Sequence, residues 1–263
     1  MTWSIEDEAR QAFELAQIYC GDCRDYHMTR AFLKAGGHQQ GPERDREMFA
    51  PLLQRLSKPE ARVLIAGAAD TGILDFVLSA IGERAPRITV IDQCRTPLVL
   101  CERFGADRGV SITTVTGDLA TAQLGPFDLI IGHVLMSFVP EDKQRDVLRR
   151  IAGMLAPEGN FVLALTNRPP EGSRRSPMSV ATVLAGLDAR GMALPGDGTA
   201  ITEALRRHLE HPRSTAGRGT AALQQLDAAG LVVRERHDTG TEVPGAADGP
   251  RPTRLYLVLQ RAA

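Results

Sequence analysis

Residues 63–72, Val-Leu-Ile-Ala-Gly-Ala-Ala-Asp-Thr-Gly, decide the fold that this sequence predicts. Four apolar residues lead directly into a turn of small residues, and a segment compatible with a helix follows over 73–81. This order is typical of a buried parallel strand whose turn lets the backbone approach a ligand closely. Because the first N–H groups of a helix have no partner within it, the turn favours a nucleotide-like or carboxylate-bearing cofactor.

A second apolar run, Ile88-Thr-Val-Ile-Asp92, ends in an acidic residue. An acid at the end of such a strand can accept hydrogen bonds from both hydroxyls of a ribose. Asp92 also has a structural interpretation, because an aspartate in this place can cap the helix that follows. The strand, tight turn, helix, second strand and acid together predict one half of a dinucleotide-type fold.

The composition indicates a globular protein without a nucleic-acid-binding or membrane-binding surface. The 263 residues allow a substantial core, and a hydrophobic share of 43% is ordinary for a globular chain. A formal net charge of −1 lacks the basic excess that those two surfaces need. The start of the chain shows no signal-peptide pattern, no apolar run reaches the ~18 residues of a membrane helix, and four cysteines do not make a disulfide framework. We therefore expect a cytoplasmic protein.

The chain divides into a helical N-terminal part and an alternating α/β part. We expect residues 1–58 to form an N-terminal helical cap, with helices over 1–35 and 43–57, and residues 59–263 to form the core. Apolar runs also predict strands at 231–235 and 254–260, and over 61–168 they alternate with amphipathic segments and predict strands at 62–66, 88–91, 111–116, 127–131 and 160–165. Such alternation predicts a parallel sheet with right-handed crossovers.

Residues 169–218 interrupt this alternation with several prolines and glycines. Two short helical pieces are expected within them, near 178–190 and 199–210. We interpret the insertion as a substrate lid, and a solvated connection is the alternative. A helix over 219–229 is expected to follow it.

Residues 60–165 resemble a class I S-adenosylmethionine-dependent methyltransferase of the small-molecule type. Gly67 and Gly72 match the glycines of that family's first turn. The turn is one residue longer than usual, Ile65 stands where the family has an acid, and Ala69 replaces the middle glycine. Ala69 is tolerable as long as its φ stays negative. The resemblance implies a Rossmann-like, mostly parallel seven-stranded sheet with helices on both faces, and S-adenosyl-L-methionine as the cofactor.

The resemblance also implies which residues hold the cofactor. Asp92 matches the ribose-binding acid, and Gly117-Asp118-Leu119 matches the loop whose acid accepts a hydrogen bond from the adenine amino group. The alternatives are an ordinary turn aspartate at Asp118 and a helix cap at Asp70. The expected set is Tyr26, His27, Gly67, Ala68, Ala69, Asp70, Gly72, Asp92, Gln93, Asp118, Leu119 and His133.

The substrate residues are expected in the loops that face the transferred methyl group. His133 follows the fourth strand, and we expect it to be the general base; a tip histidine satisfied by the backbone is the alternative. Arg30, Met136 and Arg168 are the expected substrate contacts, because arginine suits a carboxylate or phosphate on the substrate. For the basic loop around Arg168, a solvated surface is the alternative.

Cys20, Cys23 and His27 fall on one face of the expected first helix, which raises the question of a metal site. A closed zinc site needs a fourth ligand, and none stands at a characteristic spacing. Cys94 and Cys101 belong to another element and could join only through the tertiary fold. We therefore expect no metal, and expect the N-terminal helices to fold over the cofactor mouth with the cysteines buried as small hydrophobic residues.

These features together predict methyl transfer from S-adenosylmethionine to an oxygen or nitrogen of a small molecule. His133-Val-Leu-Met136 stands where nucleobase and amide-nitrogen methylases often carry Asn-Pro-Pro-Tyr, which favours a small-molecule substrate. One rival is the same fold with non-methylating chemistry or another nucleotide such as NAD; a second is a non-catalytic binding or regulatory protein. We expect no nucleic-acid or membrane partner, and a homodimer stays open.

Overall fold

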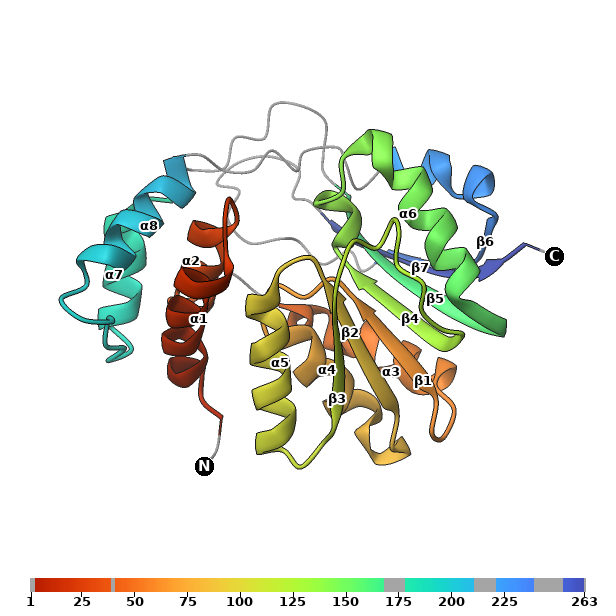
Figure 1. Cartoon of the computed structure of the whole chain (residues 1–263), viewed down its shortest axis with the longest axis horizontal. Helices are drawn as coiled ribbons and strands as arrows, with labels where there is room; N and C mark the ends of the chain where they lie inside the picture. Colours follow the sequence, from red (N-terminus) through yellow and green to blue (C-terminus); the bar gives the residue numbers. More distant parts are fainter. Residues whose placement is uncertain (1–2, 39–40, 168–177, 211–220, 239–252, 263) are drawn as a thin grey trace.

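The structure is a computed structural model, and it describes residues 3–38, 41–167, 178–210, 221–238 and 253–262. These residues form a seven-stranded sheet with the strand order β3-β2-β1-β4-β5-β7-β6 (Figure 1). The strands are β1 (Arg62–Ala66), β2 (Arg87–Asp92), β3 (Ile112–Thr116), β4 (Phe127–His133), β5 (Leu155–Asn167), β6 (Leu231–Asp238) and β7 (Thr253–Arg261). All seven predicted strands are present, although β5 begins at Leu155 rather than at residue 160.

The sheet is mostly parallel, as predicted, and it is mixed because its last two strands form an antiparallel edge. β1 lies between β2 and β4 and pairs with both in parallel, and β3 and β5 continue that direction. β7 runs antiparallel to β5 and to β6. Because antiparallel neighbours need no helical crossover, the last strand can enter between β5 and β6 from the opposite direction.

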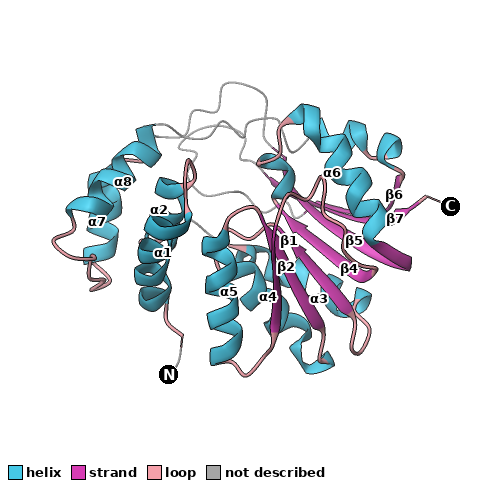
Figure 2. Ribbon diagram, in the orientation of Figure 1, coloured by secondary structure: helices cyan, strands magenta, loops and turns pink. Residues whose placement is uncertain are grey.

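Helices cover both faces of this sheet (Figure 2). The helices are α1 (Ile5–Tyr19), α2 (Arg24–Ala35), α3 (Arg46–Leu56), α4 (Gly72–Ile81), α5 (Arg95–Asp107), α6 (Glu141–Met154), α7 (Val180–Asp188) and α8 (Thr199–Glu210), with the 3-10 turns η1 (Pro42–Asp45), η2 (Gly82–Arg84), η3 (Leu135–Ser137), η4 (Ala222–Gln225) and η5 (Asp227–Ala229). Val63 and Ile65 of β1 join the core beneath α3, α4 and α5, whereas Leu64 and Ala66 join the core beneath α6, η4 and η5. This alternation explains why the strand is apolar throughout, since both of its faces are covered.

The expected helix over 1–35 is two helices in the structure. α1 ends at Tyr19, Cys20 has extended backbone (φ −98°, ψ 138°), and α2 begins only at Arg24. The expectation that Cys20, Cys23 and His27 share one helix face is therefore wrong. Of the helix expected over 219–229, the structure describes residues 221–229, and there the two short turns η4 and η5 cover 222–225 and 227–229.

The N-terminal helices pack against those of the insertion, at the end of the molecule next to α5 (Figure 1). Phe13 of α1, Phe32 of α2, Val183 of α7 and Ile201 of α8 belong to one apolar cluster. α1 also contacts α5, so this helical group packs directly against a helix of the core. None of the described helices combines the length and apolar character that crossing a membrane requires.

Candidate active site

The turn after β1 packs closely against neighbouring parts of the chain. Gly67 has φ +78°, a conformation that side chains disfavour, and its N–H donates to the carbonyl of Ile91 at 2.9 Å. A Cβ at Gly67 would lie 3.0 Å from Leu135 Cδ1. Ala69 is not among the residues with positive φ, which explains how alanine replaces glycine there.

Asp92 ties the end of β2 to this turn. Its Oδ2 accepts the N–H of Ala68 at 3.0 Å, and its Oδ1 accepts the N–H of Cys94 at 2.7 Å. Burial raises the pKa of Asp92, against the effect of these two hydrogen bonds. Each carboxylate oxygen has a second acceptor site, so two further donors can still bind Asp92.

Asp70 is held from both sides. Its Oδ1 accepts the N–H of Gly72, the first residue of α4, at 2.8 Å, and its Oδ2 accepts from Nε of Arg30 at 3.0 Å; the N-cap of that helix is Thr71. Burial acts to raise the pKa of Asp70, but the positive charges of Arg30 and Lys34 outweigh it and lower the pKa to about 2. The predicted substrate residue Arg30 is thus joined to the first turn.

Glu8 of α1 binds the same turn, and the sequence analysis did not single it out. Its two carboxylate oxygens accept the backbone N–H and the hydroxyl of Thr71, at 3.0 and 2.8 Å. Glu8 is 2% exposed, and Nζ of Lys34 lies 4.0 Å from Oε2. No sequence pattern links Glu8 to a turn in another element, so the sequence alone does not place it at this site.

The residues that were expected to bind adenine lie beside Asp92 at the carboxyl ends of β2 and β3. The N–H of Gly117 donates to the carbonyl of Asp92 at 3.0 Å, and Oδ1 of Asp118 accepts the N–H of Ala120 at 2.9 Å. This hydrogen bond has the form of the turn alternative for Asp118 and occupies one of its two oxygens. Leu119 is 8% exposed, whereas the side chain of Gln93 is exposed.

The loop after β4 begins with an unusual backbone. Val134 has φ +60°, a strained value for a β-branched residue, and its N–H donates to the carbonyl of Ala164 at 2.9 Å. Met136 is fully buried in the core on the α6 side, and its carbonyl accepts from Nε2 of Gln144 at 3.1 Å. The expected substrate contact at Met136 is therefore corrected to a packing role.

His133 lies on the other side of this strand end, among aromatic rings. Its ring centroid lies 6.1 Å from that of Phe49 and 6.4 Å from that of Tyr256. Its Nε2 is buried and has no hydrogen-bond partner among the described residues. Burial, together with the positive charge of Arg254, lowers the pKa of His133 well below its ordinary value, so the imidazole is neutral at neutral pH.

A buried polar cluster next to His133 escaped the sequence analysis. Asp45 accepts the hydroxyl of Tyr256 at 3.1 Å and Nε of Arg254 at 3.3 Å through the same Oδ2. Arg254 also donates to the hydroxyl of Thr166 at the end of β5, at 2.6 Å. These residues come from η1, β7 and β5, and only the antiparallel entry of β7 brings them together.

Tyr26 stands where three elements meet. Its ring centroid lies 6.0 Å from that of Phe138 after β4 and 5.7 Å from that of His208 in α8. His27, its neighbour, is 6% exposed. It lies among Cys20, Cys23 and Cys94 rather than in the turn between β1 and α4. Arg168 lies outside the described residues.

Two hollows lie elsewhere on the protein. One, of about 710 Å³, lies between the 120–125 loop and α6, and the other, of about 940 Å³, lies beside the first residues of β2 and β3. Neither hollow is lined by a predicted site residue.

No protein-family model and no curated protein sequence matches this chain. Solved structures do match it. A TehB-like SAM-dependent methyltransferase from Corynebacterium glutamicum has a TM-score of 0.53 at 17% identity, over 90% of this chain and 96% of that one. The CcbJ methyltransferase from Streptomyces caelestis has a TM-score of 0.54 at 16% identity, over 88% and 96%. The chain has the class I S-adenosylmethionine-dependent methyltransferase fold.

A third structure with the methyltransferase fold is the O-methyltransferase NcsB1 from neocarzinostatin biosynthesis, crystallised with S-adenosylmethionine and 2-hydroxy-5-methyl naphthoic acid. It matches with a TM-score of 0.54 at 17% identity, over 89% of this chain and 57% of that one. Open α/β sheets bind ligands at the carboxyl ends of their strands. In this chain that edge carries Gly67, Asp92, Asp118 and His133, which follow or end β1, β2, β3 and β4.

Proposed function

We propose that this chain transfers a methyl group from S-adenosylmethionine to an oxygen or nitrogen atom of a small molecule. The observation that carries the proposal is the contact between the first turn and Asp92. The Ala68 N–H binds the carboxylate directly beside Gly67, whose positive φ keeps the turn free of a side chain. In this fold, that arrangement leaves a carboxylate with spare acceptor sites next to a turn of small residues, which suits a ribose.

The charged residues around the first turn fit the remaining parts of the cofactor. Asp70 offers a negative group, which complements the ammonium of the cofactor's amino-acid part. Asp118 and Leu119 offer an acceptor and an apolar surface for the adenine. When bound, S-adenosylmethionine supplies an already activated methyl group, so the protein has mainly to position the acceptor.

His133 is proposed to receive the proton that the acceptor loses. Its Nε2 is buried without a partner among the described residues, and its depressed pKa keeps the imidazole neutral, so that one of its two ring nitrogens can accept a proton. A low pKa also makes the imidazole a weak base, which suits an acceptor that needs only partial proton transfer. The alternative is that His133 positions the acceptor through a hydrogen bond alone.

The N-terminal residues 1–58 are proposed to cap the site, and the insertion 169–218 to form its lid. The contacts of Tyr26 with Phe138 and His208 support this, because they join the cap helix α2, the loop after β4 and α8 at one place. Arg30 and Arg168 are proposed to bind an anionic group of the substrate, Arg30 from the cap and Arg168 from the segment after β5.

Ligand-dependent thermal stability tests the proposal. S-adenosylmethionine and its demethylated product should each raise the midpoint temperature of unfolding, whereas NAD should have no effect. At a ligand concentration of 100 times Kd, the free energy of unfolding should increase by ~2.7 kcal/mol. Stabilisation by NAD alone would support the nucleotide-binding rival. Stabilisation by S-adenosylmethionine with no turnover of any acceptor in a panel of phenols, amines and carboxylic acids would support a non-catalytic protein.

A further inference from the structure

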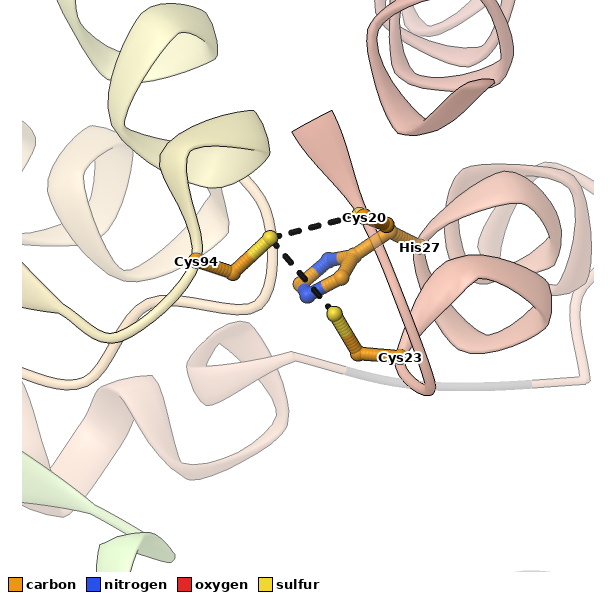
Figure 3. A group of neighbouring side chains, drawn as sticks. All are labelled: Cys20, Cys23, His27 and Cys94. Atoms are coloured by element: carbon orange, nitrogen blue, oxygen red, sulfur yellow. Dashed lines mark hydrogen bonds between the residues drawn. The ribbon is translucent and has the colours of Figure 1, made fainter. Parts of the chain in front are cut away.

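Three cysteines and one histidine converge where the α1–α2 turn meets the loop after β2 (Figure 3). Cys20 directly follows α1, Cys23 directly precedes α2, and His27 lies in the first turn of α2. Cys94 directly precedes α5. Their ligand atoms all lie within 4.8 Å of one another. The group draws on two parts of the chain, and Cys94 lies 71 residues after Cys23, which is why no sequence spacing disclosed a fourth ligand.

The distances within this group match those of a tetrahedral metal site. Sγ of Cys94 lies 3.3 Å from Sγ of Cys20 and 3.6 Å from Sγ of Cys23. In a tetrahedral zinc site with Zn–S bonds of ~2.3 Å, the sulfur atoms lie about 3.8 Å apart. Shifts of a few tenths of an ångström would therefore convert the present arrangement into a coordination sphere.

The surroundings of the group are those of a site that binds an ion. Cys20 and His27 are each 6% exposed and Cys94 is 9% exposed. Nδ1 of His27 is buried and has no hydrogen-bond partner among the described residues, an arrangement that is unfavourable unless a further group binds the ring. The hydroxyl of Thr96 lies 3.1 Å from Sγ of Cys20, where it can donate to a thiolate.

We propose that Cys20, Cys23, His27 and Cys94 bind one zinc ion in a closed Cys3His site. Thiolate and imidazole ligands select zinc over magnesium, calcium and manganese, which prefer oxygen ligands. Four protein ligands leave no open position, so the ion is structural. The ion joins the two N-terminal helices to Cys94, which lies two residues after Asp92. The site does not depend on whether the chain transfers methyl groups.

Metal analysis of the full chain tests the site. Untagged protein purified with reductant and without chelator should contain about one zinc per chain by mass spectrometry of the metals. Exchange of that zinc for Co²⁺ should give thiolate-to-cobalt charge-transfer bands and the ligand-field bands of a tetrahedral ion. Cys23→Ala, at a half-buried position, should lose the zinc and lower the midpoint of thermal unfolding by about 5 °C or more. Cys101→Ala is the matched control, because Cys101 is buried outside the group and its variant should keep the zinc.

Two results would overturn the proposal. One is wild-type protein that contains no zinc and shows no thiolate–cobalt bands when Co²⁺ is added after full reduction. Detection of a Cys20–Cys94 disulfide in such protein would then assign a redox pair to these residues. The other is full zinc content in both Cys23→Ala and Cys94→Ala. If either variant fails to fold, the wild type decides: removing the metal with a chelator should lower the midpoint, and zinc alone should restore it.

Discussion

Arg30 and Asp70 are separated by 40 residues and form an ion pair, with Nε of Arg30 3.0 Å from Oδ2 of Asp70. The pair joins α2 to the turn between β1 and α4, and the Asp70 side chain is 9% exposed. Glu8 binds the next residue of the same turn through both of its oxygens. The N-terminal helices therefore hold the conformation of the turn that is proposed to bind the cofactor.

Arg30→Met should destabilise the protein by about 1–3 kcal/mol, because it leaves the Asp70 carboxylate buried without its main counter-charge. Arg10→Met is the control, since Arg10 pairs with Asp7 on the surface with side-chain exposures of 58% and 32%. Its cost should lie below about 0.5 kcal/mol. Urea unfolding of both variants, and of Asp70→Asn with and without Arg30→Met, measures the coupling. Equal costs for the two arginine variants would show that Arg30–Asp70 behaves as a surface pair.

Much of this fold could be predicted because its strands are locally marked. Val63 to Ala66 are apolar, are followed by small residues, and lie between two covered faces, so burial and sequence pattern agree. Asp92 ends the second such run, at the edge of the sheet that also carries Gly67, Asp118 and His133. Those predictions depended only on neighbours in the sequence.

The parts that were missed depend on tertiary contacts between distant segments. The Asp45–Tyr256 hydrogen bond spans 211 residues and exists only because β7 enters the sheet antiparallel beside β5. Cys94 reaches Cys20 only because the helix expected over 1–35 breaks at Cys20. A helical pattern of apolar residues continues across that break, so periodicity alone could not show it.

Asp92→Ala should weaken the binding of S-adenosylmethionine by roughly 1–3 kcal/mol, about 5-fold to 150-fold in Kd, through the loss of charge-assisted hydrogen bonds to the ribose. Calorimetric titration measures the change. Asp128→Ala is the matched control, because Asp128 also accepts a backbone N–H, from Arg62 at 2.9 Å, but at the opposite end of the sheet. Unchanged affinity in a folded Asp92→Ala protein would remove the ribose assignment.

His133→Ala should lower turnover by roughly 10²–10⁴-fold while S-adenosylmethionine binds nearly as before, if the imidazole takes the proton of the acceptor. His133→Asn keeps a hydrogen-bonding side chain that does not titrate, so it should be almost as slow. The comparison requires single-turnover rates and cofactor Kd for both variants. A rate restored by asparagine would make His133 a positioning residue, and an alanine variant with a normal rate would exclude it from the active site.

His133 should make the protein less stable as the pH is lowered below about 6.5. Burial holds the pKa of this imidazole well below its ordinary value in the folded state, with Arg254, Arg30 and Arg44 adding positive charge and Asp70 opposing them. In the unfolded chain the ring takes up a proton near ~6.5, so between the two pKa values the unfolded state binds more protons and stability rises with pH. Its contribution is therefore complete above ~6.5 and decreases by at most about 1.4 kcal/mol per pH unit below it. His133→Phe, which keeps a ring beside Phe49 and Tyr256, should remove this slope. Urea unfolding measures the decrease in the free energy of unfolding between pH 7.5 and pH 5.5. This decrease should be larger for the wild type than for the variant by about 1.4 kcal/mol. Equal decreases would mean that His133 is protonated in the folded protein.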